Sequence, residues 1–264
     1  MISIIVPTLG ARKECFERLV ESLENQSNVE IELIVVSQEN HGIIEDILEN
    51  SNVNVQHIKI DKKGLSIARN EGMKYVKGNI VTFGDDDCWY PKDIFNEIEK
   101  TFNEINTDIA CFNILDPIKD KLYKSYKEKK IERMNELNLL KVSSIEIYLN
   151  LDRVNKENII FDEEFGLGAI YKTGEENILM MDLHKKGYKI TYLPKVVVYH
   201  LIKESNETLT PQMSYCKGAA FKRMFNTLKG LIYINILIIK HRKKTKNLFS
   251  CISNANKGFL DYEV

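Results

Sequence analysis

Residues 64–91 read GLSIARNEGMKYVKGNIVTFGDDDCWYP and join a helix-forming segment, a short apolar strand and three consecutive carboxylates. Residues 80–83 have the β-branched, apolar character of a central parallel strand that is covered on both faces. Asp85, Asp86 and Asp87 follow it. Because neighbouring carboxylates repel one another, a compensating cation is expected, and hard oxygen ligands favour Mg²⁺ or Mn²⁺. The alternative is a solvated acidic turn.

The residues around this stretch alternate between strand and helix patterns. The other apolar runs that favour strands in the first half are 2–6, 31–36, 53–60 and 109–115. The segments with helical spacing of apolar side chains, or with helix start and stop signals, are 11–25, 43–48, 66–76 and 91–102. This order predicts an α/β fold with a mostly parallel central sheet and flanking helices.

Ligands of open α/β sheets bind beyond the carboxyl ends of the strands. The three aspartates lie at this edge, and so do the residues that follow the first three strands. These residues are Pro7, Thr8, Ser37, Gln38 and Asp61. Ordinary loop polarity is the alternative explanation for them.

The second half of the chain has a weaker pattern. Residues 116–158 are rich in Lys and Glu, and we interpret them as an inserted, variable segment in which residues 143–146 can start a short helix. Residues 161–168, FDEEFGLG, place acids before a glycine-containing loop. Residues 173–176, TGEE, then begin a helix, and residues 190–199 form a strand pattern that delivers His200 at its end.

Composition limits the cellular setting. The five cysteines lie far apart without a Cys-x-x-Cys pair, which argues against disulfides and a thiolate zinc site and fits a reducing cytoplasm. The N-terminal MISIIVPTLG has no basic flank, so we expect no signal peptide. No apolar stretch reaches the roughly 18 to 20 residues of a membrane span.

The charge is unevenly distributed. The net charge is -1, yet residues 208–260 contain ten Lys and Arg residues and no Asp or Glu. Within this tail, residues 228–239 are apolar and are flanked by basic residues, so we expect peripheral attachment to the anionic cytoplasmic face of a membrane. A helix that packs on the domain or on a partner in a homodimer is the alternative. We expect no nucleic-acid partner, because the tail lacks a recognisable motif.

Taken in order, the segments IIVPT, GLSIARNEG, FGDDDCWYP, TGEEN and VVVYH resemble the family 2 glycosyltransferases of the GT-A fold over about residues 1–201. The resemblance implies inverting transfer of a sugar from a nucleotide-diphosphate donor to a glycan or lipid-linked acceptor, as in cell-surface polysaccharide synthesis. It implies a catalytic domain at 1–205, with a nucleotide-binding half at 1–115 and an acceptor-side half at 116–205. A basic amphipathic helical tail at 206–264 would follow.

The resemblance assigns roles to the aspartates. The family's Asp-x-Asp element holds the donor through a divalent cation and the ribose, and Asp85 and Asp87 match it. A register with Gly84 first and Asp86 second is also open, so all three aspartates are retained. His200 resembles a histidine that some members use as a further metal ligand or phosphate contact. The implied metal ligands are therefore Asp85, Asp87 and His200, around Mn²⁺ or Mg²⁺.

The implied donor-binding residues are Pro7, Thr8, Gln38, Arg69, Asp85 and Asp86. Arg69 matches the arginine of the family's A-R-N element. The sequence VSQEN at 36–40 departs from the Asp-rich turn that the family often shows there. This departure leaves the nucleotide base open, and UDP is the family default.

Glu176 matches the catalytic base of the family's Glu-Asp pair, and Glu175 is its rival because a Glu replaces the Asp. Alternatively, Thr173 and Glu176 form a capping box that only satisfies backbone N–H groups. The expected acceptor-side residues are Trp89, Glu164 and Gly166.

Two other functional classes are alternatives. A noncatalytic nucleotide-sugar-binding or scaffold domain would keep the strands without needing a base. A sugar-nucleotide pyrophosphorylase would need a glycine-rich loop after the first strand, where this chain has PTLGARKE with one glycine.

Overall fold

The computed structural model describes residues 1–202, 209–245 and 247–263, and the chain divides into two compact units. The first unit comprises Met1–Lys63, Ile67–Ile160 and Leu183–Ile202. The second comprises Gly64–Ser66, Phe161–Asp182 and the described residues after 208.

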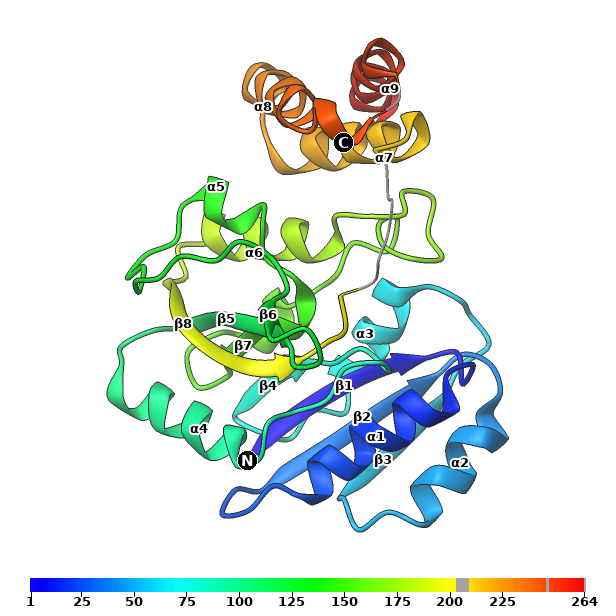
Figure 1. Cartoon of the computed structure of the whole chain (residues 1–264), viewed down its shortest axis with the longest axis vertical. Coiled ribbons are helices and arrows are strands. Elements are labelled where there is room, and N and C mark those ends of the chain that lie inside the picture. Colours follow the sequence, from blue (N-terminus) through cyan, green and yellow to red (C-terminus); the bar gives the residue numbers. More distant parts are fainter. Residues whose placement is uncertain (203–208, 246, 264) are drawn as a thin grey trace. The chain divides into compact units, whose positions relative to one another are not determined.

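The first unit is built on a sheet that contains eight strands among the described residues, in the order β3-β2-β1-β4-β7-β5-β6, with β8 also paired to β5. The strands are β1 (Ile2–Thr8), β2 (Ile31–Ser37), β3 (Val55–Lys59), β4 (Ile80–Phe83), β5 (Ile109–Asp116), β6 (Lys121–Leu122), β7 (Ile147–Asn150) and β8 (Ile190–Tyr199). β1 to β4 pair in parallel, and β8 is parallel to β5. β7 is antiparallel to β4 and β5. The predicted α/β fold is confirmed (Figure 1), with parallel pairing in its first half and mixed pairing around β7.

Helices cover both faces of this sheet. α1 (Lys13–Glu24), α2 (His41–Glu49) and α4 (Ile94–Glu104) pack on one face, where alternate strand residues such as Ile4 join Phe16 and Phe95 in a buried cluster. Ile5 lies on the other face, which α3 (Leu65–Met73) covers. A Cβ atom on Gly72 of α3 would lie 2.6 Å from Ile5 Cγ2, so the missing side chain allows α3 to approach the sheet closely.

The segment 116–158 contributes more than the predicted insertion. Its residues 147–150 form β7, which lies between β4 and β5 and is buried along its length. A run of four residues is too short for periodicity to identify as a strand. The predicted helix start at 143–146 is the 3₁₀ helix η1 (Ser144–Glu146), where the Ser143 N–H donates to the Glu146 carboxylate at 3.3 Å. The other short helices are α5 (Glu136–Leu139), η2 (Lys156–Asn158) and η3 (Arg242–Lys244).

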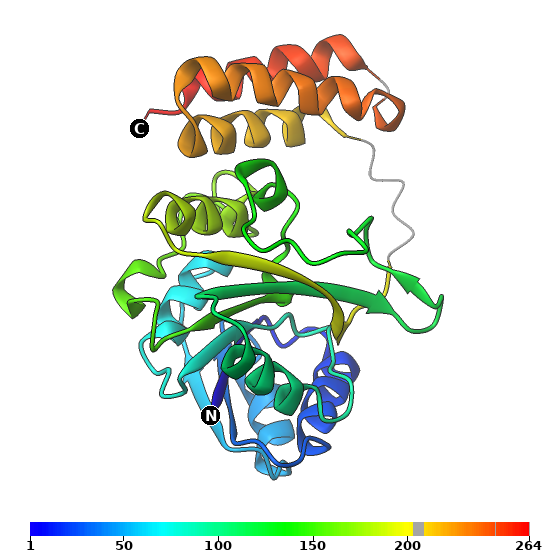
Figure 2. The same cartoon turned by 90° about the vertical axis from the view of Figure 1, so that its left-hand side faces the viewer.

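The second unit contains the start of α6 (Glu175–Lys185) and the C-terminal helices α7 (Pro211–Met224), α8 (Thr227–Lys240) and α9 (Leu248–Asp261). The three C-terminal helices lie side by side (Figure 2). α7 and α9 meet at two glycines: a Cβ atom on Gly218 would lie 2.0 Å from the Ala255 carbonyl oxygen, and one on Gly258 would lie 2.0 Å from that of Tyr215. A side chain at either position would overlap the partner helix.

Polar contacts hold the second unit together. Arg223 of α7 donates to Asp162 and Asp182, each at 2.8 Å, and so ties α7 to the loop that precedes α6 and to α6 itself. The Ser66 hydroxyl donates to the Phe165 carbonyl at 2.6 Å. α3 begins at Leu65, one residue before the predicted start at 66, so Ser66 lies inside the helix and is not its N-cap.

α8 has two different faces. Ile234 and Ile238 are buried, whereas Leu228, Ile232, Ile236 and Ile239 are between 47% and 73% exposed. These four residues are called the α8 stripe below. Within the described residues, no helix is both long enough and apolar enough to cross a bilayer.

Candidate functional site

Three strands of the first unit deliver polar side chains to one edge of the sheet. Thr8 ends β1, the aspartates 85–87 follow β4 after Gly84, and His200 follows β8. Because β1 and β4 are parallel neighbours, their carboxyl ends coincide, as the sequence predicted. Trp89 joins the third strand to this edge, since its backbone N–H donates to the Tyr199 carbonyl at 3.1 Å and its carbonyl accepts from Tyr199 at 2.7 Å.

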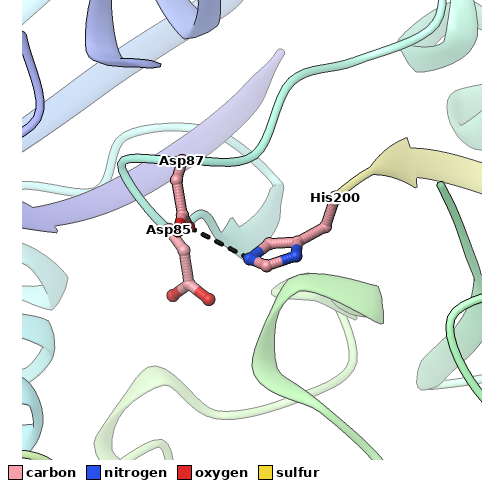
Figure 3. A group of neighbouring side chains, drawn as sticks. All are labelled: Asp85, Asp87 and His200. Carbon is pink, nitrogen blue, oxygen red and sulfur yellow. Dashed lines mark hydrogen bonds and ion pairs between the residues drawn. The ribbon is translucent and has the colours of Figure 1, made fainter. Parts of the chain in front are cut away.

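Asp85, Asp87 and His200 form the centre of the site. Each offers one ligand atom, and these atoms all lie within 4.8 Å of one another. His200 Nε2 lies 3.1 Å from Asp87 Oδ1, as Figure 3 shows. Its Nδ1 lies 2.9 Å from the Leu201 carbonyl, which can only accept, so Nδ1 carries hydrogen. With Nδ1 directed at the backbone, Nε2 is the ring nitrogen that faces the carboxylate of Asp87.

The environment raises the pKa of His200 and the pKa of Asp86, the residue between the two aspartates of the cluster. Burial by itself lowers the pKa of His200, but the hydrogen bond and charge of Asp87, together with the charge of Asp85, raise it above its usual value. Burial raises the pKa of Asp86; the hydrogen bond from Thr8 and the charge of Arg12 oppose this effect without cancelling it. The site thus concentrates negative charge in a poorly solvated place.

Two arginines neutralise part of this negative charge. Arg69 is 1% exposed, and its guanidinium lies 3.3 Å from Asp85 Oδ1 and 2.7 Å from the Ser144 hydroxyl. Arg12 lies 2.6 Å from Asp86 Oδ1 and also pairs with Asp87. The inference that the three carboxylates require a metal is incomplete, because the protein supplies cations of its own.

Sequence reasoning missed Arg12 and Ser144. The partners of Arg12 are about 75 residues away in the chain, so no local pattern shows the contact. The signal that was available is its position, four residues after Thr8 in the loop beyond the first strand, at the edge where ligands were expected.

The other predicted donor-binding residues surround this edge. The Thr8 hydroxyl donates to Asp86 at 2.7 Å and accepts from the Gly10 N–H at 3.0 Å. Gln38 follows β2 and is buried, and its backbone N–H donates to the Thr8 carbonyl at 3.0 Å. Pro7 lies within β1, opposite Val36 of β2. Thr8, Arg69, Asp85 and Asp86 are therefore linked through direct contacts around the aspartates, with Pro7 and Gln38 beside Thr8.

One face of Trp89 is occupied. The Arg18 guanidinium lies 3.6 Å from the centre of the indole ring, and the Tyr199 ring lies 5.7 Å away at 56°. A sugar cannot stack on the face that Arg18 covers. The acceptor-binding role of Trp89 stays a prediction for the rest of its surface.

The remaining predicted residues belong to the second unit. Glu175 and Glu176 begin α6. Gly166 has a φ of +104°, and a Cβ atom there would lie 3.2 Å from the carboxyl carbon of buried Glu175. The Glu164 carbonyl accepts from the Tyr171 N–H at 2.9 Å. The structure brings Gly166 and Glu175 together, and the roles of Glu164, Gly166, Glu175 and Glu176 stay predictions.

Comparison with known proteins gives one matching family model, described as Glycosyl transferase family 2, over residues 3–161. The Glycosyltransferase GlyA of Streptococcus pneumoniae is 25% identical over 219 residues, which are 78% of this chain and 31% of GlyA. The GalNAc(5)-diNAcBac-PP-undecaprenol beta-1,3-glucosyltransferase of Campylobacter jejuni is 26% identical over 218 residues, 79% of this chain and 67% of that enzyme. This chain thus spans about a third of GlyA and two thirds of the Campylobacter enzyme.

Solved structures share the fold. Residues 1–349 of Staphylococcus aureus TarS, in complex with UDP-GlcNAc, superpose with a TM-score of 0.66 at 16% identity. The match covers 98% of this chain and 90% of the TarS chain.

Proposed function

Because this chain belongs to the family 2 glycosyltransferases, we propose that it moves a sugar from a nucleotide-diphosphate donor to an acceptor hydroxyl, with inversion at the anomeric carbon. The observation that carries this proposal is the cluster of Asp85, Asp87 and His200 at the carboxyl edge of the sheet. Arg69 adds a fixed positive charge beside it. A diphosphate and its cation fit such a place, where charged groups of both signs converge.

The donor class is a UDP-sugar, and the acceptor is a saccharide carried on a lipid or polymer, as in the synthesis of cell-surface glycans. The TarS complex, which contains UDP-GlcNAc, supports the donor class. The Campylobacter relative, whose name includes an undecaprenol-linked saccharide, supports the acceptor class.

The residues at the centre of the site fit a divalent cation such as Mn²⁺ or Mg²⁺. Two carboxylates and one imidazole nitrogen converge. Because Nδ1 keeps its hydrogen toward the Leu201 carbonyl, Nε2 is the nitrogen that would bind the ion, after releasing to solvent the hydrogen that it directs at Asp87. Asp85, Asp87 and His200 would hold the ion. A cation bound there supplies positive charge that stabilises the diphosphate leaving group.

A carboxylate of the protein is proposed to act as the general base of the reaction. The acceptor oxygen forms a bond to the anomeric carbon while the bond from that carbon to the diphosphate oxygen breaks. The proton of the acceptor hydroxyl passes to a carboxylate, for which we propose Glu176, with Glu175 as the alternative. Glu164 and Gly166, in the loop beside Glu175, are proposed to contact the acceptor. Trp89 is a further proposed acceptor-binding residue.

We place the protein on the cytoplasmic face of a membrane, held by the α8 stripe. Three observations support this location: the exposed isoleucines and leucine, the ten basic residues of the tail, and the absence of acidic residues from 208–260. An apolar helix face edged with lysines is complementary to anionic lipid. The location suits a lipid-linked acceptor. Pairing of the stripe with a second copy is the alternative outcome.

A screen of nucleotide sugars for hydrolysis, with Mn²⁺ or with EDTA, tests the proposal. We expect release of the nucleoside diphosphate from a UDP-sugar with Mn²⁺, and its loss with EDTA. Binding without turnover for every donor, even with saccharide acceptors present, would instead favour a noncatalytic nucleotide-sugar-binding domain.

A further inference from the structure

Arg12 differs from the other arginine of the site in how firmly it is held. Arg69 is buried, and the Ser144 hydroxyl fixes its guanidinium. The side chain of Arg12 is 46% exposed, and it extends from the loop between β1 and α1 to the carboxylates of Asp86 and Asp87. One arginine is therefore buried and held by a further group, whereas the side chain of the other is half-exposed and contacts the carboxylates of Asp86 and Asp87.

Arg12 occupies carboxylate oxygens at the place where a metal ion would bind. Asp87 pairs with Arg12 through Oδ2 and lies 3.1 Å from His200 through Oδ1, and it is one of the three residues that converge as metal ligands. A divalent cation on Asp87 would repel a guanidinium in the same place and would draw electron density from the carboxylate. A metal ion on Asp87 would therefore weaken the pairing of Arg12 with this carboxylate.

We propose that Arg12 is an exchangeable counter-ion of this site: it neutralises Asp86 and Asp87 while the site is empty, leaves Asp87 when the divalent cation binds, and then pairs with the diphosphate of the donor. This inference rests on the proposed function. The planar fork of a guanidinium matches two phosphate oxygens as well as it matches two carboxylates. The loop that carries Arg12 starts at the carboxyl end of β1, beside the aspartates, so a change of rotamer is enough to redirect the side chain.

Calorimetric titration of the full chain tests this exchange in two steps. In the first step Mn²⁺ alone is the ligand, and Arg12→Ala is expected to bind it more tightly than wild type, by about fivefold, the size that a partly exposed ion pair reaches. In the second step UDP is added at saturating Mn²⁺, and Arg12→Ala is expected to bind UDP more weakly than wild type, by about tenfold, because a charge-assisted bidentate pair is lost.

Lys13→Ala is the matched control. Lys13 is the next residue in the chain, carries the same charge, and pairs with Glu17 at 3.8 Å rather than with the aspartates. Both affinities should stay within about twofold of wild type, since exposed charges are well screened. Arg12→Gln removes the charge but keeps a hydrogen-bond donor, and it should change both affinities in the same directions as Arg12→Ala. The melting temperature of each variant checks its fold.

Opposite changes in the two affinities would support the exchange. Mn²⁺ affinities of Arg12→Ala and Arg12→Gln that equal those of wild type and Lys13→Ala would overturn it, and so would an unchanged UDP affinity. Those results would leave the proposed function standing. If neither wild type nor the Arg12 variants bound Mn²⁺ or UDP, the proposed function itself would fail.

Discussion

The side chains of Asp87 and His200 meet although 113 residues separate them, with His200 Nε2 3.1 Å from Asp87 Oδ1. The contact exists because β8 reaches the edge of the sheet at which β4 ends, and because Trp89 and Tyr199 are joined through two backbone hydrogen bonds. The backbone N–H of His200 also donates to the Leu115 carbonyl at 3.0 Å, which attaches the histidine to the end of β5.

Asp116, at the end of β5, holds the chain just after His200. Its carboxylate accepts from the backbone N–H groups of Ile118, Lys119 and Ile202 at 2.9, 3.1 and 2.8 Å. Burial by itself raises the pKa of Asp116, but these three hydrogen bonds lower it below its usual value. Such a group stabilises the fold above its unfolded pKa, about 3.9, and this contribution is lost as the pH falls through the lower folded pKa.

We therefore expect Asp116→Asn to be less stable than wild type at pH 7, and the difference to shrink as the pH falls below about 4. Urea unfolding followed by circular dichroism at several pH values measures this. Asp46→Asn, at an exposed position of α2, should show no such trend. A stability difference that stays constant down to pH 3 would mean that the hydrogen bonds of Asp116 do not cause it.

The parts of the fold that the sequence predicted are those with a strong local pattern. β4 and β8 have the predicted bounds, because each is an apolar or β-branched run that ends at polar residues. Helix starts were harder. Pro91 was predicted as a first helical residue, but α4 begins at Ile94, because Asp93 adopts a left-handed φ of 58° and accepts a hydrogen bond from the Ser27 hydroxyl.

The parts that could not be predicted depend on contacts distant in sequence. β7 is recognisable as a strand only through its pairing with β4 and β5. Arg12 has no motif, and its role depends on the arrival of Asp86 and Asp87 beside its loop. The aspartates were expected at the edge of the sheet where strand ends collect, which is a rule of topology and not of local sequence. His200 was grouped with them through the resemblance to the family.

The proposed general base is tested by substitution with the isosteric amide. General-base catalysis typically contributes about 10² to 10⁴-fold, so Glu176→Gln should lose roughly that much turnover while UDP affinity and melting temperature stay near those of wild type. Steady-state kinetics with a sugar donor measure the turnover. Glu175→Gln is the matched comparison, one residue away at the same helix start.

The two variants separate the assignments. Loss of turnover in Glu175→Gln alone would move the base to Glu175, which packs beside Gly166. Near-normal turnover in both would contradict the proposal, and would direct the search to Asp162, Glu163 or Glu164 in the loop before α6.

The contact between α7 and α9 depends on two residues without side chains. Gly218→Ala or Gly258→Ala places a methyl group 2.0 Å from a backbone oxygen of the other helix, and such overpacking costs about 1–3 kcal/mol or more. We expect faster amide hydrogen exchange in α7 and α9. Gly42→Ala is the control, since a Cβ atom there meets nothing within 4 Å, and it should stabilise α2 by about 0.5–1 kcal/mol. Unchanged exchange in Gly218→Ala would refute the close contact.

The α8 stripe is tested with lipid vesicles. We expect the wild-type chain to sediment with vesicles that contain anionic phosphatidylglycerol at low salt, and to sediment less at high salt. The double variant Ile232→Ser and Ile236→Ser should lose most of this binding. Ile118→Ser, at a 76% exposed position of the first unit, should keep it. If the wild type fails to sediment but forms a dimer that the double variant cannot form, the stripe binds a second copy and not a membrane.

In the proposed function a divalent cation, held by Asp85, Asp87 and His200, carries the nucleotide diphosphate. Calorimetric titration of UDP into the wild-type chain and Asp87→Asn, each with Mn²⁺ and with EDTA, tests it most directly. We expect EDTA to weaken UDP binding to wild type by tenfold or more, about 1.4 kcal/mol, and Asp87→Asn to bind UDP weakly in both conditions. Asp46→Asn should behave as wild type. Equal UDP affinity with Mn²⁺ and with EDTA in the wild type, or full Mn²⁺-dependent affinity in Asp87→Asn, would contradict it.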